Sequence, residues 1–219
     1  MTLLDFARGP AFQASVLIMT AGICWRLVGI LLLRRRSHFA SPRHSLLGRI
    51  AGGASMIVSR FIPRRTFWPR ISVSVALSTI FHLGLAIIIL GGAPHILVIH
   101  QFTGLSWPNL PKGLVVIVSG LTLASMIALL IRRLTHPVMR LLSTVDDYLS
   151  WALVFLPVVT GILLSGEIII GYRTLLALHI LSAELLIIWL PFGKLMHGVL
   201  VFASRGAMGL NFARKGAAT

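Results

Sequence analysis

The sequence is poor in negative charge. Only 5 of its 219 residues are acidic, against 20 Lys and Arg, and charged residues make up 11% of the chain. Soluble domains carry roughly 25% charged and 45–50% apolar residues, whereas 57% of this chain is hydrophobic and its mean hydropathy is +0.93. These values exclude a soluble enzyme and a nucleic-acid-binding protein, and they indicate an integral membrane protein.

Cysteine is almost absent, since Cys24 is the single one in the sequence. One thiol cannot form an internal disulfide, and it cannot hold an iron–sulfur cluster, which needs about four ligands. The sequence has no C-x-x-C-H motif, which excludes covalently attached c-type haem. Any iron–sulfur chemistry therefore requires a partner subunit.

Long apolar runs dominate the rest of the chain. Each is close to or longer than the roughly 20 residues that cross a bilayer core, and inside lipid such runs must be helical because the backbone finds no water there. The runs are Ala11–Leu33, Ile71–Ile99, Gly113–Ile131, Tyr148–Gly166 and Thr174–Leu190, with the last helix expected to continue to residue 204. We therefore predict an all-α membrane protein, with residues 1–219 forming a single five-transmembrane-helix bundle and residues 34–70 a basic connector.

The basic residues predict the orientation, because Lys and Arg concentrate on the cytoplasmic side of membrane proteins. The first connector, the connector after the third run and the C-terminal tail together hold 16 of them, namely Arg34, Arg35, Arg36, Arg43, Arg49, Arg60, Arg64, Arg65, Arg70, Arg132, Arg133, Arg140, Lys194, Arg205, Arg214 and Lys215. The opposite side holds Arg8, Lys112 and Arg173. This predicts an N-terminus outside and a C-terminus in the cytoplasm, with the basic face meeting a soluble subunit, anionic membrane lipids, or both. The stretch "HSLLGRIAGGASMIVSRF" is either an amphipathic surface helix or a loop.

Histidines recur inside the apolar runs. His179 and His197 are eighteen residues apart, which on one continuous helix is five turns, or about 27 Å along one face. The second run carries His82, His95 and His100, and its antiparallel direction places them at matching depths. Intramembrane ionisable residues usually serve function, and imidazole is an axial ligand of haem. Two bis-histidine b-type haems are predicted; the alternative is histidines hydrogen-bonded between helices or lying at the interfaces.

Two motifs carry a family resemblance. "HILSAELLIIWLPFGKLMH" resembles the last helix of the gamma subunit of respiratory nitrate reductase, where two haem-ligating histidines eighteen apart enclose a Pro-Phe pair and a basic residue; here these are His179, Pro191, Phe192, Lys194 and His197. "FHLG", residues 81–84, resembles the first ligand motif of the second helix.

The chain departs from the nitrate reductase pattern ten residues after His82, where Gly92 cannot ligate. His95 and the "GLSWP" loop, residues 104–108, are instead similar to cytochrome b subunits of membrane redox complexes in sulfate reducers, which partner with iron–sulfur proteins of the heterodisulfide-reductase type. Helical periodicity favours His100 as the second ligand of this run, because thirteen residues rotate a side chain by about 220°. The resemblance favours His95, and Gly91, Gly92 and Pro94 can kink the helix before it.

The resemblance implies a di-haem cytochrome b that passes electrons between a membrane quinone and a cytoplasmic iron–sulfur subunit of a larger complex in the bacterial inner membrane. It implies an inner haem held by His82 and His197, and an outer haem held by His95 and His179. The basic residues expected to hold the haem propionates are Arg26, Arg70 and Lys194. For Arg70 and Lys194, the alternative is that they only set the topology and extend to the membrane surface. The quinone is expected beside the outer haem, near His100, Gln101 and Trp107.

Glu184 lies in the middle of the fifth run. It is expected either to relay protons or bind a haem edge, or to form an interhelical hydrogen bond or an ion pair with Arg26. Two other functions stay open for the chain as a whole. One is a non-redox membrane anchor of a complex, and the other is a small proton or solute transporter, which no internal repeat supports.

Overall fold

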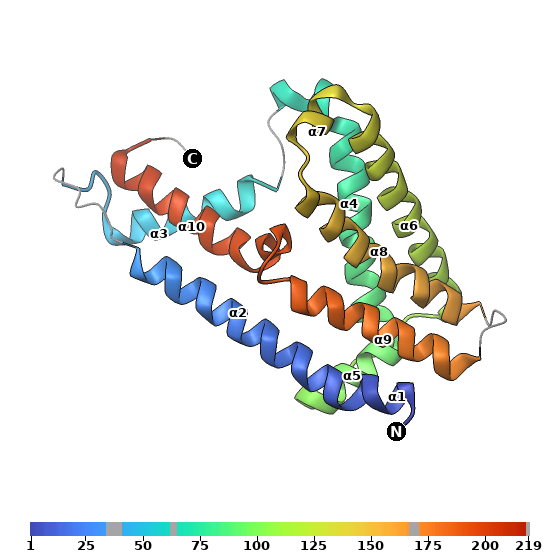
Figure 1. The fold of residues 1–219 in the computed structure, drawn as a ribbon. Helices are drawn as coiled ribbons and strands as arrows, with labels where there is room; N and C mark the ends of the chain where they lie inside the picture. Colours follow the sequence, from blue (N-terminus) through green and yellow to red (C-terminus); the bar gives the residue numbers. More distant parts are fainter. Residues whose placement is uncertain (34–40, 62–64, 167–170, 218–219) are drawn as a thin grey trace. The chain divides into compact units, whose positions relative to one another are not determined.

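The computed structural model describes residues 1–33, 41–61, 65–166 and 171–217 (Figure 1). Arg34, Arg35, Arg36 and Arg64, counted above in the basic connector, lie outside these ranges. The described residues form helices and contain no strand. The elements are α1 (Leu3–Phe6), η1 (Ala7–Ala11), α2 (Phe12–Leu32), α3 (Leu46–Ser59), η2 (Arg65–Phe67), α4 (Trp68–Gly91), α5 (Ala93–Thr103), α6 (Lys112–Thr135), α7 (Pro137–Leu142), α8 (Val145–Ser165), α9 (Tyr172–Trp189), η3 (Lys194–Met196) and α10 (His197–Lys215).

Five helical stretches are long and apolar enough to cross a membrane, which confirms the predicted all-α membrane protein. These stretches are Leu3–Leu32, Trp68–Gly91, Lys112–Thr135, Val145–Ser165 and Tyr172–Trp189. Each is apolar around most of its circumference, as expected of helices surrounded by lipid. Most of their large apolar side chains are exposed in the isolated chain, and in water this exposure would be very unfavourable.

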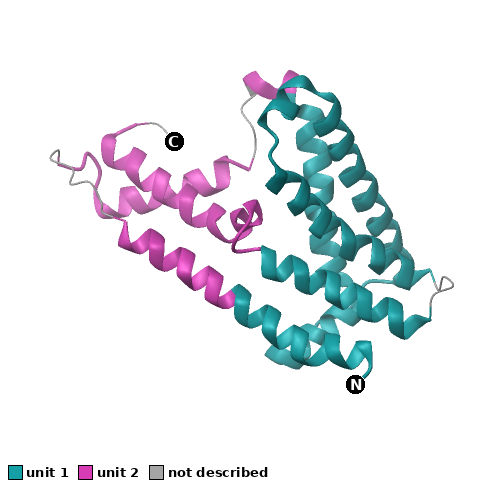
Figure 2. Cartoon of the chain, in the orientation of Figure 1, with its two compact units in different colours: residues 1–19, 71–189 teal, residues 20–70, 190–219 magenta. Residues whose placement is uncertain are grey.

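The chain divides into two compact units, coloured separately in Figure 2. Unit 1 comprises residues 1–19 and 71–189, and unit 2 comprises residues 20–70 and 190–219. Unit 1 contains most of α4 and all of α5 to α9. Unit 2 contains the second half of α2 together with α3 and α10.

The centre of unit 1 lies among α6, α8 and α9. Met126 of α6 and Val154 and Val158 of α8 are buried there. Two indole groups join the helices through hydrogen bonds: Trp151 donates to the Met126 carbonyl at 3.1 Å, and Trp189 donates to the Ser150 hydroxyl at 2.9 Å. These polar contacts fix the relative register of three helices whose lipid-facing surfaces cannot do so.

Helix α4 meets α6 at a glycine. A Cβ added at Gly84 would overlap the hydroxyl of Thr122 and lie 3.1 Å from its Cβ. Thr122 is fully buried, and its hydroxyl donates to the Val118 carbonyl at 2.7 Å. The absence of a side chain at position 84 thus permits close packing of the two helices, a common arrangement in membranes.

The prediction of one helix from residue 174 to 204 is wrong. Helix α9 ends at Trp189, and α10 begins at His197 after the short η3 turn. Pro191 ends the helix because it has no N–H and its ring clashes with the preceding turn. Arg26 of α2 stabilises the break, its Nε donating to the Pro191 carbonyl at 3.0 Å and its Nη2 to the Phe192 carbonyl at 3.3 Å.

Candidate functional site

The second apolar run is also interrupted, just before His95. Helix α4 ends at Gly91 and α5 starts at Ala93, with Gly92 between them in an extended conformation (ψ 124°) and Pro94 in the first turn of α5. Proline is favourable at this position because a first-turn N–H has no intrahelical partner. The break changes the direction of the helix and redirects the side chain of His95.

Two side chains bind carbonyls at the break. The Ile88 carbonyl accepts from His95 Nδ1 at 2.9 Å in addition to the Gly92 N–H at 3.1 Å. The Leu90 carbonyl accepts from Trp107 Nε1 at 2.6 Å. The "GLSWP" loop therefore folds back over the break, and its Trp107 serves as a hydrogen-bond donor. Unpaired backbone carbonyls are costly at membrane depth, so the loop and the imidazole stabilise the break together.

Gly92 is required for the orientation of His95. A Cβ at this position would lie 2.8 Å from the Ile88 oxygen and 3.1 Å from His95 Nδ1. These are the two atoms of the hydrogen bond that fixes the imidazole. A larger residue would separate them and release the ring.

His95 faces His179 of α9. The two ring centroids are 6.1 Å apart and the ring planes are inclined by 38°. His179 Nδ1 lies 3.0 Å from the Thr160 hydroxyl of α8. That hydroxyl donates to the Leu156 carbonyl at 2.8 Å, so the imidazole N–H is the donor between His179 and Thr160.

Gly161 lets the His179 ring lie close to α8. A Cβ added there would be 3.2 Å from His179 Cε1. The partly buried ring therefore rests on the backbone of α8 beside Thr160. Three helices, α5, α8 and α9, position this pair of histidines.

The donor set suits a metal held between two imidazoles. A neutral imidazole that donates from Nδ1 keeps a lone pair on Nε2, and both His95 and His179 donate from Nδ1. A metal binds an imidazole nitrogen at about 2 Å, so two histidines that would hold one ion must have their rings close together. The ring centres of His95 and His179 are 6.1 Å apart, and these two residues would hold the metal.

The other two predicted ligands have the same local geometry. His82 Nδ1 donates to the Ser78 carbonyl at 2.7 Å in α4, and His197 Nδ1 donates to the Lys194 carbonyl at 2.8 Å at the start of α10. A hydrogen bond from the second ring nitrogen to a carbonyl is typical of metal-ligating histidine. His82 belongs to unit 1 and His197 to unit 2, and their pairing stays a prediction.

The remaining predicted residues are exposed, as His82 and His197 also are. His100, Gln101, Arg70 and Lys194 are exposed, and Arg26 contacts the backbone of the α9 break. The His100 carbonyl accepts from the Gly104 N–H at 2.8 Å, which ends α5. The structure thus brings His95, and not His100, next to His179.

Glu184 is the buried acid of the described chain, with 4% of its surface exposed. Its Oε1 has no hydrogen-bond partner among the residues that the structure describes. The roles expected for Glu184 stay predictions.

No group of three or more His, Cys, Asp or Glu side chains that could hold a metal ion occurs among the described residues. A haem would need only two histidine ligands from the chain, which the pair His95 and His179 would provide.

A relative in Nitratidesulfovibrio vulgaris strain Hildenborough, described only as a protein, is 31% identical to this chain over 219 residues. The match covers 98% of this chain and 96% of the relative. The chain belongs to the same family as that protein. No family model matches the sequence, and no solved structure matches it. The match therefore establishes common ancestry along almost the whole chain, and it does not indicate an activity.

The sequence analysis did not identify Thr160, the hydrogen-bond partner of His179. Its signal was weak, since one threonine within the apolar stretch "LPVVTGILL" commonly bonds to its own helix, as Thr160 also does. Ser182, one turn after His179, lies 3.4 Å from the same hydroxyl. Pairing these residues required knowing which faces of α8 and α9 meet.

Proposed function

We propose that the chain is a membrane di-haem b cytochrome subunit that passes electrons between the quinone pool and a cytoplasmic iron–sulfur subunit. The observation that carries this proposal is the pair of facing imidazoles of His95 and His179, in a chain whose surface is built for lipid. Haem iron bound between them would cycle between its ferric and ferrous states. The four residues proposed to hold the two haems are His82, His95, His179 and His197.

The protein's own contribution is to orient the imidazoles and keep their tautomers fixed. His95 is locked by the Ile88 carbonyl at the α4 break, and His179 is locked by the Thr160 hydroxyl. Both hydrogen bonds increase the electron donation from Nε2, which favours the higher oxidation state of a bound metal. Arg70 and Lys194, both exposed, are proposed to neutralise haem propionates, and Arg26 remains proposed for the same role beside its backbone contacts.

The orientation proposed for the chain places its N-terminus outside and its C-terminus in the cytoplasm of a bacterial inner membrane. The distribution of Lys and Arg supports it. His95 and His179 then hold the outer haem, and the neighbouring segment with His100, Gln101 and Trp107 is proposed to receive the quinone. The single cysteine supports a separate iron–sulfur partner on the cytoplasmic side.

The experiment is an anaerobic titration of the oxidised purified complex with a menaquinol analogue, followed by absorption spectroscopy. The proposal predicts that the quinol reduces a b-type spectrum, and that His179→Ala removes part of that spectrum. If the protein contains haem but the quinol does not reduce it, the quinone is excluded as the substrate and the proposal of a cytochrome remains. A colourless complex would reject the cytochrome and leave a non-redox anchor.

A further inference from the structure

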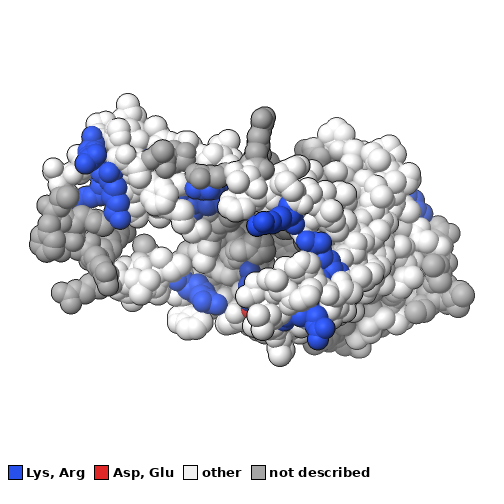
Figure 3. All heavy atoms as spheres, turned by 90° about the horizontal axis from the view of Figure 1, so that it is seen from above, with Lys and Arg blue, Asp and Glu red and all other residues white. Residues whose placement is uncertain are grey.

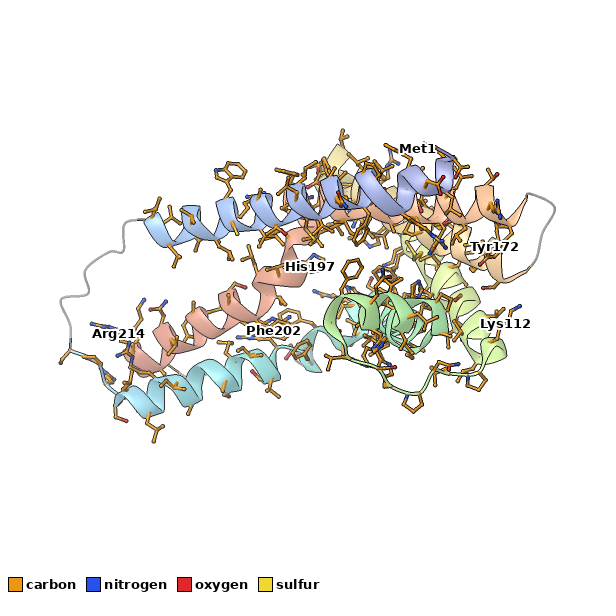
Figure 4. The ribbon with its side chains drawn as sticks, turned by 90° about the horizontal axis from the view of Figure 1, so that it is seen from below. Met1, Lys112, Tyr172, His197, Phe202 and Arg214 are labelled. Carbon is orange, nitrogen blue, oxygen red and sulfur yellow. The ribbon has the colours of Figure 1, made fainter. Side chains whose placement is uncertain are left out.

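The residues outside the haem proposal include a helical hairpin in unit 2. Helices α3 and α10 lie side by side (Figure 4) and run antiparallel. At one end, the Arg43 N–H donates to the Arg214 carbonyl at 3.0 Å. At the other end, the rings of Phe61 and Phe202 are 6.2 Å apart. The two helices therefore pack along their whole length.

Small residues allow this close packing. A Cβ on Gly52 would lie 2.7 Å from the Ala213 Cβ, and one on Gly53 would lie 3.2 Å from the Gly206 carbonyl oxygen. Gly209 is buried against the same part of α3. The face of α3 that carries these glycines is thus covered by α10, and the opposite face of α3 is left without a described neighbour.

That opposite face is an apolar stripe. Leu47, Ile50 and Val58 are 77%, 52% and 70% exposed, respectively. At 100° per residue these positions fall within about 80° of one another around the helix. The outer face of α10, by contrast, exposes the polar residues Ser204, Asn211 and Lys215 beside Met208, which is 49% exposed. The hairpin therefore has one apolar side and one mainly polar side.

Helix α3 cannot cross a membrane. Its 14 residues correspond to about 21 Å of helix, against a hydrocarbon core of about 30 Å. Its C-terminal end at Ser59 is close in sequence to the spanning helix that starts at Trp68. The exposed aromatic residues Phe67 and Trp68 are of the kind that lies at the headgroup level.

The charge of unit 2 has a single sign. Residues 20–70 and 190–219 contain no Asp or Glu, and they contain 14 of the 20 Lys and Arg. In the face drawn in Figure 3, basic side chains recur while acidic atoms are confined to one small spot. Such a charge distribution repels a second copy of the same hairpin and attracts an anionic surface.

We propose that the α3–α10 hairpin lies flat on an anionic lipid leaflet, with the stripe formed by Leu47, Ile50 and Val58 inserted below the headgroups. Helix α10 covers α3 from the water side, and the arginines at the hairpin ends bind lipid phosphates. A soluble acidic protein would match the charge but would leave the apolar stripe in water. A lipid leaflet satisfies both features, and α4, the next long helix in the sequence, is apolar enough to cross a membrane.

The test uses single-cysteine variants of the full chain in lipid nanodiscs, in a Cys24→Ser background. A bimane label is placed at Leu47→Cys or Val58→Cys on the stripe, and at Asn211→Cys on α10 as the matched control. Nanodiscs contain either phosphatidylcholine alone or phosphatidylcholine with phosphatidylglycerol. Quenching by iodide in water and by a lipid spin-labelled near the headgroup is measured at low and high salt.

The proposal predicts that the labels at positions 47 and 58 are quenched by the spin-labelled lipid and protected from iodide, while the label at 211 behaves in the opposite way. Phosphatidylglycerol should increase the lipid quenching severalfold, and high salt should reduce it. Labels at 47 and 58 that stay accessible to iodide in anionic nanodiscs would overturn the proposal. So would protection that appears only when an acidic soluble partner is added.

Discussion

Removing the Thr160 hydroxyl tests how the proposed outer haem site is built. Thr160→Val keeps the shape of the side chain and deletes the acceptor for His179 Nδ1, which lies 3.0 Å from the hydroxyl. The variant should leave α8 intact, because the other bonds of the hydroxyl are to the Leu156 and Pro157 carbonyls of the same helix and a longer one, 3.4 Å, to Ser182 of α9. Its effect should therefore be concentrated on His179.

The expected magnitude follows from the loss of one partner of a metal ligand. Losing such a partner costs about 10–100-fold in metal affinity, or about 1.4–2.8 kcal/mol. Because the hydrogen bond to Nδ1–H strengthens the imidazole as a donor, its loss weakens the ferric state more than the ferrous state. If the affinity for the ferric form falls tenfold more than the affinity for the ferrous form, the reduction potential rises by about 59 mV.

The assay is a potentiometric titration of the purified variant combined with its haem content. Thr160→Ser should behave like the wild type because it keeps the hydroxyl. Thr135→Val is the matched control, since the exposed Thr135 hydroxyl bonds to the Ile131 carbonyl of its own helix. Unchanged potential and haem content in Thr160→Val would refute the assigned role of this hydrogen bond.

Three further changes test the proposed site and the helix packing around it. His95→Ala should remove one haem per chain in a pyridine-haemochrome assay, and His100→Ala should retain both haems. The reverse result would make His100 the haem ligand in place of His95. Gly84→Ala should lower the free energy of unfolding in detergent by about 1–3 kcal/mol through overpacking. Gly120→Ala is the control, because a Cβ at that position meets nothing within 4 Å. Equal losses of stability in the two variants would contradict the packing of α4 on α6. Trp107→Phe should cost about 1–3 kcal/mol because it leaves a carbonyl at the α4 break unpaired, and a variant as stable as the wild type would argue against this role.

The five spanning helices could be predicted because composition alone requires them. Runs of about 20 apolar residues have few other stable forms, and α6 (Lys112–Thr135) and α8 (Val145–Ser165) enclose most of the predicted ranges 113–131 and 148–166. The exact ends differ by a few residues because polar caps decide them. At the start of α8, for example, Thr144 and Asp147 form a reciprocal capping box, which periodicity does not reveal.

The position of His95 depended on a break that the sequence only permitted. Gly91, Gly92 and Pro94 made a kink possible, yet they do not specify its angle. The angle is set by contacts from residues distant in sequence, such as the indole of Trp107. For that reason the sequence left the choice between His95 and His100 open. The structure places the His95 ring 6.1 Å from that of His179, and the identity of the haem ligand stays a prediction.

In the fifth apolar run, the sequence analysis overlooked a helix break that the structure contains. Apolar residues on both sides of Pro191 led to one predicted helix to residue 204, although an interior proline removes a hydrogen bond and commonly breaks a helix. The argument that His179 and His197 share a face of one helix therefore does not hold. The resemblance of the motif around them to haem-ligating helices is independent of that argument and stays a prediction.

The pairing of α3 with α10 was also beyond the sequence analysis. The stretch around Leu46–Ser59 was expected as a surface helix or a loop, and the structure shows a helix. Its partner lies in the C-terminal tail, and the glycines that join them are informative only after both helices are placed. Contacts of this kind depend on tertiary packing, which local periodicity does not contain.

The central claim is that this chain holds two b-type haems, and the most direct test is the haem content per chain of protein purified with its partner subunits. The measurement combines a pyridine-haemochrome assay with a reduced-minus-oxidised absorption spectrum. The account predicts two b-type haems per chain. Protein that is free of haem would contradict it, and would assign the hydrogen-bonded histidines to helix packing in a membrane anchor.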